Sequence, residues 1–530
     1  AASPDGDTDL VERYRSIRSL LDASPLIDDL DDVQLAWDFT VRPADSFELS
    51  TSARAIRAGL ESDSSSIDIS VDVIEEKSDG CEGLSEIGSF EDYARQLWLR
   101  VSVPRILADS TRDSNARSDL EAIRLEAEET NESMATRLGR LNSVGVFVGL
   151  PCSLEEQLSS GGALEIERVL FWGHGLFSDR AEALAEAVRE VANKAETLVV
   201  ALDWRGLSRH NFPVVMRALL REPELLRPVA SNLVQGFVSI ATVVEWVRSG
   251  DAVDPSFVSF LKRWSPSIEL ASDVELLFYG YSAGGILGAG LAGSVVPFDR
   301  AVLGAGGDPF TFLLSRSNNF RFYEQVFRLA VVDGFDVRLV LSLLQVFFDD
   351  ISGVSSSTFT EADAADSDLI SGVTNSRTDG RTTPQVLVFA ALGDSNVPRL
   401  GTEISARDFN CSIFQEAFEV NDFQEDALYG LPNVSSSAES VTFGDGDRGC
   451  VFFEMRYEEE FLDIPDDNGF PPDGEVHSCL PVDNEVQDTA AIFLRNGTIL
   501  NTCDTALYPR GCRRRNADES CDAFSSFVPR

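Results

Sequence analysis

LLFYGYSAGGILG, residues 276–288, is the stretch that decides the fold of this 530-residue chain. Its first four residues, Leu276 to Tyr279, are apolar or aromatic and predict a buried β-strand. The glycines on either side of Ser282 predict a tight turn, and the small residues after it predict the start of a closely packed helix. A strand, a Gly-x-Ser-x-Gly turn and a helix in this order hold a serine hydroxyl exposed at the edge of a sheet.

Ser282 is therefore the candidate nucleophile. Glycines flank it because a side chain at either position would collide with neighbouring backbone in so tight a turn. The N-terminus of the following helix places positive dipole beside any oxyanion that forms there. The strand before the turn and the helix after it favour this role, and the alternative is a glycine-rich turn with an inert serine.

A serine hydroxyl needs a base, and the chain has only three histidines, His174, His210 and His477. In α/β-hydrolases the chain order is nucleophile, acid, histidine, so the base must follow Ser282. His477 alone does, in a Pro- and Gly-containing segment that predicts a loop. We take His477 as the base; the alternative is an exposed loop histidine.

The acid that orients the histidine should follow a strand between Ser282 and His477. The apolar run 385–392 predicts such a strand, and Asp394 stands at its end. Asp308, at the end of an earlier strand, is the second choice. Either aspartate would otherwise cap a turn, the commoner role of a Gly-Asp pair.

Two backbone N–H groups should hold the oxyanion, that of the residue after the nucleophile and one from an earlier loop. Ala283 is the first, and Leu176, in the segment Gly173-His174-Gly175-Leu176 after a predicted strand, is the second. His174 is then expected to be a scaffold residue. His210 is expected either to line the pocket or to lie in a loop.

The pattern of apolar residues predicts two parts. Period-two alternation at 67–74 and short apolar runs at 35–41, 97–103 and 144–150 predict a β-rich N-terminal unit, residues 1–160. Residues 161–530 predict an α/β domain, because strands at 169–172, 197–202, 274–279, 301–303 and 385–391 alternate with helical segments such as 184–195 and 233–247. Residues 309–383 form an insertion predicted to be a helical cap or an ordinary packed helix pair.

Composition limits the partners and the compartment. The net charge of −44, from 88 acidic against 44 basic residues, argues against nucleic acid and anionic membranes as partners. The longest uncharged stretch, 276–298, is broken by glycines and predicts no transmembrane segment. Acidic clusters at 28–32, 445–447 and 466–473 offer oxygen ligands for calcium, but none has the twelve-residue loop pattern, so a solvated acidic face is favoured and no cofactor is expected.

Eight cysteines without a Cys-x-x-Cys pair favour disulfides over zinc. Six of them form a disulfide-bearing C-terminal segment: Cys411, Cys450, Cys479, Cys503, Cys512 and Cys521. Disulfides favour an oxidising compartment, so we expect a secreted, extracellular protein, or a periplasmic or cell-surface one. The Ala1-Ala2-Ser3-Pro4 start fits a mature N-terminus after cleavage of a leader, and it fits a shortened chain as well. The sequence indicates no oligomeric state.

The run 278–288 resembles the nucleophile elbow of secreted bacterial lipase-like α/β-hydrolases, the virulence-factor lipases of proteobacteria and myxobacteria. Segments 35–40, 173–176, 203–208, 392–394 and 487–497 look similar too. The resemblance implies a serine esterase or lipase that acts on small-molecule or lipid esters. Two alternatives stay open: a non-catalytic surface or assembly protein that keeps the fold, and a peptidase or acyltransferase on the same triad.

Overall fold

A computed structural model describes part of the chain: residues 69–78, 81, 93–105, 141–220, 226–251, 253–296, 298–314, 316–327, 334–352, 384–414, 433–434, 440–443, 449–456, 475–500 and 512–513. The chain divides into two compact units, Ala1–Phe47 and Glu48–Arg530, and every described residue belongs to the second. The predicted strand 35–41, the segment 35–40 of the resemblance and the three acidic clusters lie outside the described residues.

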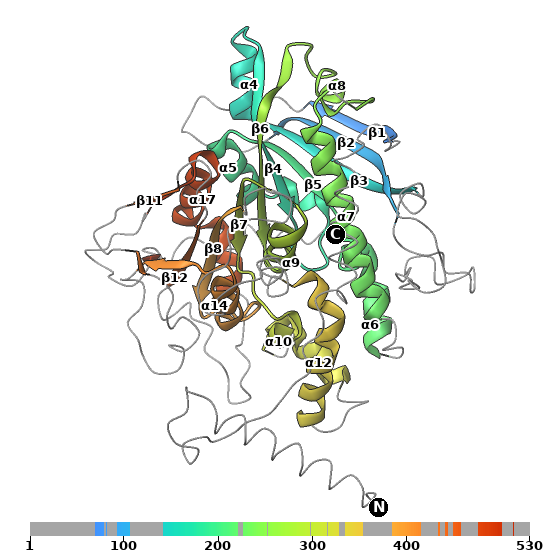
Figure 1. The fold of residues 1–530 in the computed structure, drawn as a ribbon, viewed down its shortest axis with the longest axis vertical. Helices are drawn as coiled ribbons and strands as arrows, with labels where there is room; N and C mark the ends of the chain where they lie inside the picture. The colour runs from blue at the N-terminus through green and yellow to red at the C-terminus, as the bar shows by residue number, and fades with distance from the viewer. Residues whose placement is uncertain are drawn as a thin grey trace, which may run out of the picture. The chain divides into compact units, whose positions relative to one another are not determined.

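A mostly parallel sheet forms the centre of this unit (Figure 1). Its strand order is β1-β2-β3-β5-β4-β6-β7-β8-β12-β9-β10, and β14 pairs with β12. From β5 to β12 all neighbours are parallel, whereas β3 is antiparallel to both β2 and β5. A parallel sheet that begins with antiparallel strands, with the serine turn after a central strand, is the α/β-hydrolase fold.

The strands of this sheet are β1 (Val71–Ser78), β2 (Tyr93–Pro104), β3 (Leu141–Pro151), β4 (Leu164–Gly173), β5 (Leu198–Leu202), β6 (Ile268–Tyr281), β7 (Arg300–Gly304), β8 (Gln385–Leu392), β9 (Ser412–Phe414), β10 (Asn433–Val434), β12 (Cys450–Arg456) and β14 (Cys512–Arg513). A separate pair consists of β11 (Ser440–Thr442) and β13 (Thr498–Leu500). The five predicted strands of the α/β part are confirmed as β4 to β8.

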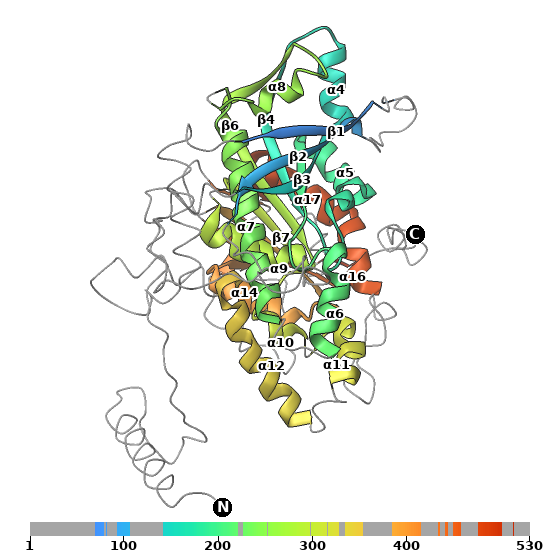
Figure 2. The same ribbon diagram turned by 90° about the vertical axis from the view of Figure 1, so that its right-hand side faces the viewer.

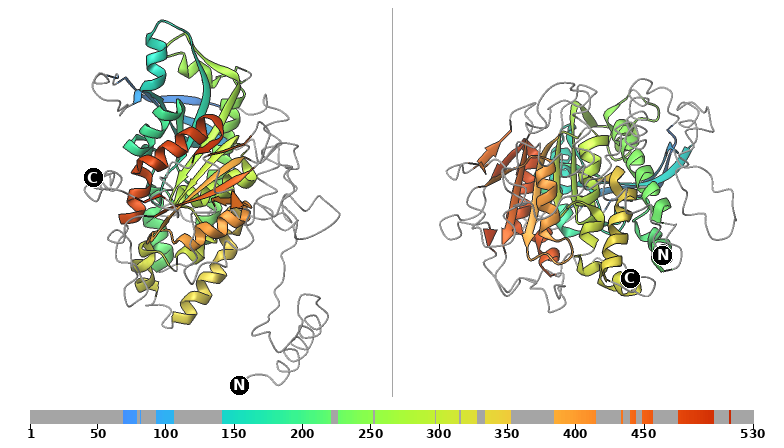
Figure 3. Two further views of the ribbon diagram at one scale, coloured as in Figure 1. Left: turned by 90° about the vertical axis from the view of Figure 1, so that its left-hand side faces the viewer. Right: turned by 60° about the horizontal axis from the view of Figure 1, so that its bottom comes forward.

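Helices cover both faces of the sheet. In β4 the side chains alternate, so that Val169 and Phe171 join one core while Leu170 and Trp172 join the other. The first core packs against α7 (Leu226–Arg248) and α9 (Ala283–Gly290), and the second against α5 (Glu186–Ala195) and α17 (Asn484–Asn496). Figure 1 shows the two helix layers, and the left view of Figure 3 shows α5 and α17 side by side.

Strands β2 and β3 are part of this same sheet, since β3 pairs with β5 over Val146 to Gly149. The boundary between the two compact units lies at residue 47, and pairing within the sheet is continuous across residue 160, where the sequence pattern divides the chain. A second difference is β12, which the sequence pattern does not predict. It lies between β8 and β9 in the sheet, although the region 411–474 is strongly acidic.

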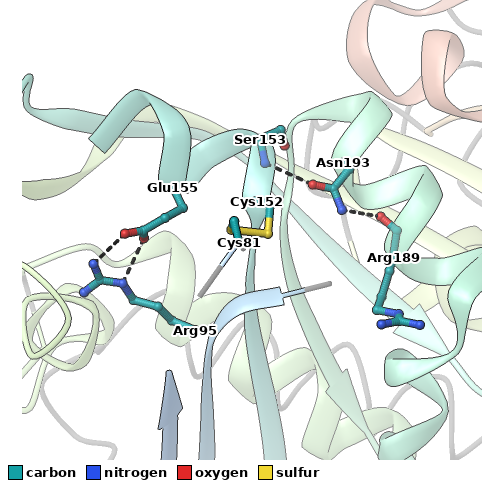
Figure 4. The surroundings of a disulfide bond; sticks show 7 residues. All are labelled: Cys81, Arg95, Cys152, Ser153, Glu155, Arg189 and Asn193. Atoms are coloured by element: carbon teal, nitrogen blue, oxygen red, sulfur yellow. Dashed lines mark hydrogen bonds and ion pairs between the residues drawn. A yellow bond between two sulfur atoms is a disulfide. The ribbon is translucent and has the colours of Figure 1, made fainter. Parts of the chain in front are cut away.

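The first strands are also tied to the following helix by covalent and ionic contacts (Figure 4). A disulfide joins Cys81 to Cys152, the first residue of α4 (Cys152–Ser159). Arg95 of β2 donates two hydrogen bonds to the carboxylate of Glu155, at 2.8 and 2.6 Å. A second disulfide, Cys411–Cys450, joins the segment after α14 (Arg399–Asp408) to β12.

The insertion between β7 and β8 is helical where the structure describes it, in agreement with that part of the prediction. Its helices are α10 (Phe310–Leu314), α11 (Arg321–Phe327) and α12 (Gly334–Phe348). Helix α11 contacts α6 (Phe212–Leu220), which belongs to the connection after β5 (Figure 2). The remaining α-helices described are α8 (Phe257–Leu261) and α16 (Glu475–Cys479).

Among the helices described, only α7 contains a segment long and apolar enough to cross a membrane, Pro228–Arg248. The most apolar part of this segment is almost entirely buried within the protein, as in the core helix of a globular domain. The uncharged stretch 276–298 begins in β6, continues through the turn at Ser282 and includes α9, as the sequence predicts.

Candidate active site

Ser282 occupies a strained turn between β6 and α9. Its backbone has φ 58° and ψ −122°, a region that costs a non-glycine residue about 1–3 kcal/mol. The neighbours fit only as glycines: a Cβ at Gly280 would lie 2.1 Å from the Gly284 carbonyl oxygen, and one at Gly284 would lie 1.9 Å from that of Gly173. Tight contact of three backbone segments therefore enforces the turn that the sequence predicts.

His477 and Asp394 are hydrogen-bonded to each other. The distance from His477 Nδ1 to Asp394 Oδ2 is 2.7 Å, and both residues are more than nine-tenths buried. His477 lies in the short helix α16 and not in the loop that the sequence predicts, because residues 475–479 form one helical turn. The other oxygen of Asp394, Oδ1, accepts the backbone N–H groups of Asn396 and Val397, each at 2.9 Å.

Tyr281 joins the serine turn to the histidine. Its hydroxyl donates a hydrogen bond to the backbone carbonyl of His477, and the two rings lie 5.1 Å apart between centroids. Tyr281 is fully buried and immediately precedes Ser282. The histidine is therefore held directly beside the residue before the candidate nucleophile.

Asp308 and His210, the other sequence candidates, make no contact with His477 among the contacts described. Asp308 is fully buried, and its Oδ1 accepts a hydrogen bond from the Ser352 hydroxyl at 2.6 Å. The carboxylate at His477 is that of Asp394, so the first choice fits this geometry and the second does not. His210 is exposed in the 3₁₀ turn Arg209–Asn211.

The loop after β4 approaches the serine closely. A Cβ built on Gly175 would lie 4.0 Å from Ser282 Cβ and 3.5 Å from Glu182 Oε2. Leu176 follows Gly175 and is half-buried, and Ala283 is the first residue of α9. Among the described residues, neither the Leu176 nor the Ala283 N–H donates to a turn, loop or cap carbonyl.

Glu182, a residue that no sequence pattern singles out, lies buried behind this loop. Both of its oxygens accept the Gly175 N–H, at 3.0 and 3.1 Å, and Oε1 accepts Trp172 Nε1–H at 3.3 Å. Burial raises the pKa of Glu182, while hydrogen bonds from Ser178, Gly175 and Trp172 act to lower it. Nothing in the segment 181–190 distinguishes this glutamate from the exposed Glu186, so only the fold reveals it.

Within the described residues, no group of three or more His, Cys, Asp or Glu side chains is arranged to hold a metal ion. The acidic clusters considered for calcium lie outside those residues.

No protein-family model matches the chain, and no curated protein matches it. Solved structures with some likeness include acetyl xylan esterase 1 from Thermoanaerobacterium sp., with 12% sequence identity, a TM-score of 0.35 and coverage of 70% of this chain and 89% of that one. An arylesterase has 13% identity, a TM-score of 0.28 and coverage of 67% and 79%. An esterase from Pyrobaculum calidifontis has 16% identity, a TM-score of 0.31 and coverage of 67% and 81%. Likeness at this level identifies no substrate for this chain.

Proposed function

We propose that this protein is a serine hydrolase that cleaves carboxylic or lipid esters through Ser282, His477 and Asp394. The observation that carries the proposal is the 2.7 Å hydrogen bond between His477 Nδ1 and Asp394 Oδ2, formed beside the strained serine turn. A buried carboxylate at Nδ1 leaves Nε2 free to accept the proton of a serine hydroxyl. Backbone strain at a serine flanked by obligatory glycines is typical of a functional residue.

The reaction has two acyl-transfer steps. Ser282 Oγ attacks the ester carbonyl carbon while His477 Nε2 takes the hydroxyl proton, and the leaving alcohol departs with that proton. Water then attacks the acyl-serine ester, His477 again takes and returns a proton, and the carboxylic acid is released. In both steps the N–H groups of Leu176 and Ala283 would bind the oxyanion, since neither donates to a turn, loop or cap carbonyl among the residues described.

The disulfides and the net charge indicate the compartment of this activity and the charge of its substrates. The disulfides Cys81–Cys152 and Cys411–Cys450 favour an oxidising compartment, which fits a secreted, periplasmic or cell-surface enzyme. The net charge of −44 favours uncharged or cationic substrates over anionic ones.

The test is hydrolysis of p-nitrophenyl esters of increasing acyl length by the wild type and by Ser282→Ala. We expect hydrolysis by the wild type, a loss of at least about a thousandfold in the variant, and labelling of Ser282 by a fluorophosphonate. The control is Ser160→Ala, because Ser160 is exposed. Ser178→Ala is not a suitable control, because Ser178 lies in the loop after Leu176 and contacts Glu182. An inactive, unlabelled wild type across chain lengths and salt would instead support the non-catalytic alternative.

A further inference from the structure

The peptide group between Gly175 and Leu176 is hydrogen-bonded at its carbonyl end by two donors. His174 Nδ1 lies 2.7 Å from the Gly175 oxygen, and the Ser178 N–H donates to the same oxygen at 3.2 Å. The N–H of this peptide is that of Leu176, which would face the oxyanion in the proposed reaction. The preceding peptide is also held, because the Gly175 N–H donates to both oxygens of Glu182.

The direction of the His174 hydrogen bond follows from its other nitrogen. The backbone N–H of Trp204 can only donate, and it lies 2.8 Å from His174 Nε2, so Nε2 must accept. A neutral imidazole then carries its proton on Nδ1 and donates it to the Gly175 oxygen. Trp204 also donates its indole N–H to the His174 carbonyl at 3.0 Å, which fixes the backbone of this fully buried histidine.

A carbonyl that accepts hydrogen bonds becomes more polarised, and the N–H of the same peptide group becomes a stronger donor. We propose that His174 and Glu182 are positioning residues that aim and polarise the Leu176 N–H toward the oxyanion. This inference rests on the proposed function. It concerns residues that would never touch the substrate, since both act through the backbone of Gly175.

The burial of Glu182 favours this role over a purely structural one. A carboxylate that is 6% exposed carries a desolvation cost of several kcal/mol unless its hydrogen bonds compensate. Among the described residues, no lysine or arginine forms an ion pair with Glu182, and its partners are N–H and hydroxyl groups of the loop beside the serine and of the strand before it. A Cβ on Gly175 would lie 3.5 Å from Glu182 Oε2, so the carboxylate packs directly against this loop.

Three variants test the inference: Glu182→Gln, His174→Gln and the control Glu186→Gln, an exposed glutamate four residues away. An oxyanion forms only in the transition state, so a weaker or misaimed donor lowers kcat and leaves KM nearly unchanged. Since removing an oxyanion donor costs about 100- to 1000-fold, we expect weakening one to lower kcat about 10- to 100-fold in the first two variants. The control should match the wild type.

A trifluoromethyl ketone with the acyl chain of the ester provides a second measurement, because it forms a tetrahedral oxyanion on the serine. Its inhibition constant should rise by the same factor by which kcat/KM falls. A purely structural role would instead reduce the folded, titratable fraction of enzyme and leave the remaining enzyme with normal kcat and inhibition.

The inference is overturned if kcat in both variants stays within about threefold of the control, if it rises because removing the Glu182 charge favours the oxyanion, or if only KM changes. If Glu182→Gln or His174→Gln prevents folding, Trp172→Phe takes its place, because it removes a single donor to Glu182. This variant should still lower kcat with KM unchanged, and an unchanged kcat in Trp172→Phe also overturns the inference. An inactive wild type would refute the proposed function itself, whereas an active wild type with unaffected variants refutes only this inference.

Discussion

Replacing Asp394 by asparagine tests the proposed triad more sharply than removing the serine, because the substitution keeps shape and changes only which atoms donate. In the wild type, Asp394 Oδ1 accepts two backbone N–H groups and Oδ2 faces His477 Nδ1. In the Asp394→Asn variant, the amide oxygen must keep the position of Oδ1. A flipped amide would leave both N–H groups without an acceptor, at about 1–3 kcal/mol each.

The amide nitrogen of the variant therefore faces His477 Nδ1 and donates to it. Nδ1 must then accept, so the imidazole proton moves to Nε2, and Nε2 can no longer take the proton of Ser282. A triad with the wrong tautomer loses about 10⁴ in kcat, or about 5 kcal/mol of transition-state stabilisation. KM should change little, because the ground-state ester makes no contact with Asp394 in this mechanism.

The measurement is kcat and KM for a p-nitrophenyl ester with Asp394→Asn and with Asp308→Asn as the matched variant, and thermal melting establishes that each is folded. Asp308 binds the Ser352 hydroxyl and should leave kcat within a few-fold of the wild type. The reasoning is refuted if Asp394→Asn retains more than about a tenth of the wild-type kcat. It is equally refuted if Asp308→Asn is the more damaging variant.

Three further changes have expected results. Tyr281→Phe removes the hydrogen bond to the His477 carbonyl and should lower kcat about 10-fold while the free energy of unfolding falls by about 1 kcal/mol; a change in stability without one in kcat, measured on the same sample, would contradict a positioning role. Burial raises the pKa of Asp408 to about 8, so the folded state holds this proton more tightly than the unfolded state and stability falls as pH rises from about 4 to about 8. In urea titrations the unfolding free energy of the wild type should fall between pH 5 and 8, and in Asp408→Asn this fall should be smaller by at most about 4 kcal/mol. If the unfolding free energies of the wild type and the variant depend on pH in the same way, the raised pKa of Asp408 is contradicted. Finally, Cys81→Ser with Cys152→Ser opens a loop with a sequence separation of 71, which should lower the unfolding free energy by about 4 kcal/mol; equal urea midpoints with and without the bridge would exclude that stabilisation.

Local patterns in the sequence predict the elements of this fold well and their pairing less well. The strand before Ser282 and the run just before Asp394 each carry their own apolar pattern, and each is found where expected. The strand β12 carries a similar apolar pattern, but acidic segments surround it, so composition masks it. The sequence pattern places strand β3 in the N-terminal unit, although the strand pairs with β5. This pairing joins residues about fifty positions apart, and no local pattern encodes such a pairing.

Glu182 and His174 illustrate the same limit at the site. Their roles depend on burial and on a hydrogen bond from the Trp204 backbone, a group that every residue except proline possesses. The sequence shows that His174 precedes the loop, but not which nitrogen carries the proton. That follows only once the end of β5 is placed beside the end of β4.

The choice between Asp308 and Asp394 shows how the order of the strands in the sheet decides which carboxylate meets the histidine. Parallel strands have their carboxyl ends at one edge, so Ser282 after β6, Asp308 after β7 and Asp394 after β8 all lie along that edge. With neighbouring strands about 4.8 Å apart, the end of β7 is nearer to the serine than the end of β8, about 10 Å away. Distance alone would therefore favour Asp308. The position of His477 favours Asp394 instead. His477 follows β12, which lies beyond β8 in the sheet, and the Tyr281 hydroxyl donates a hydrogen bond to its backbone carbonyl. An imidazole that enters from that side meets the carboxylate at the end of β8 first, which leaves Asp308 to bind Ser352.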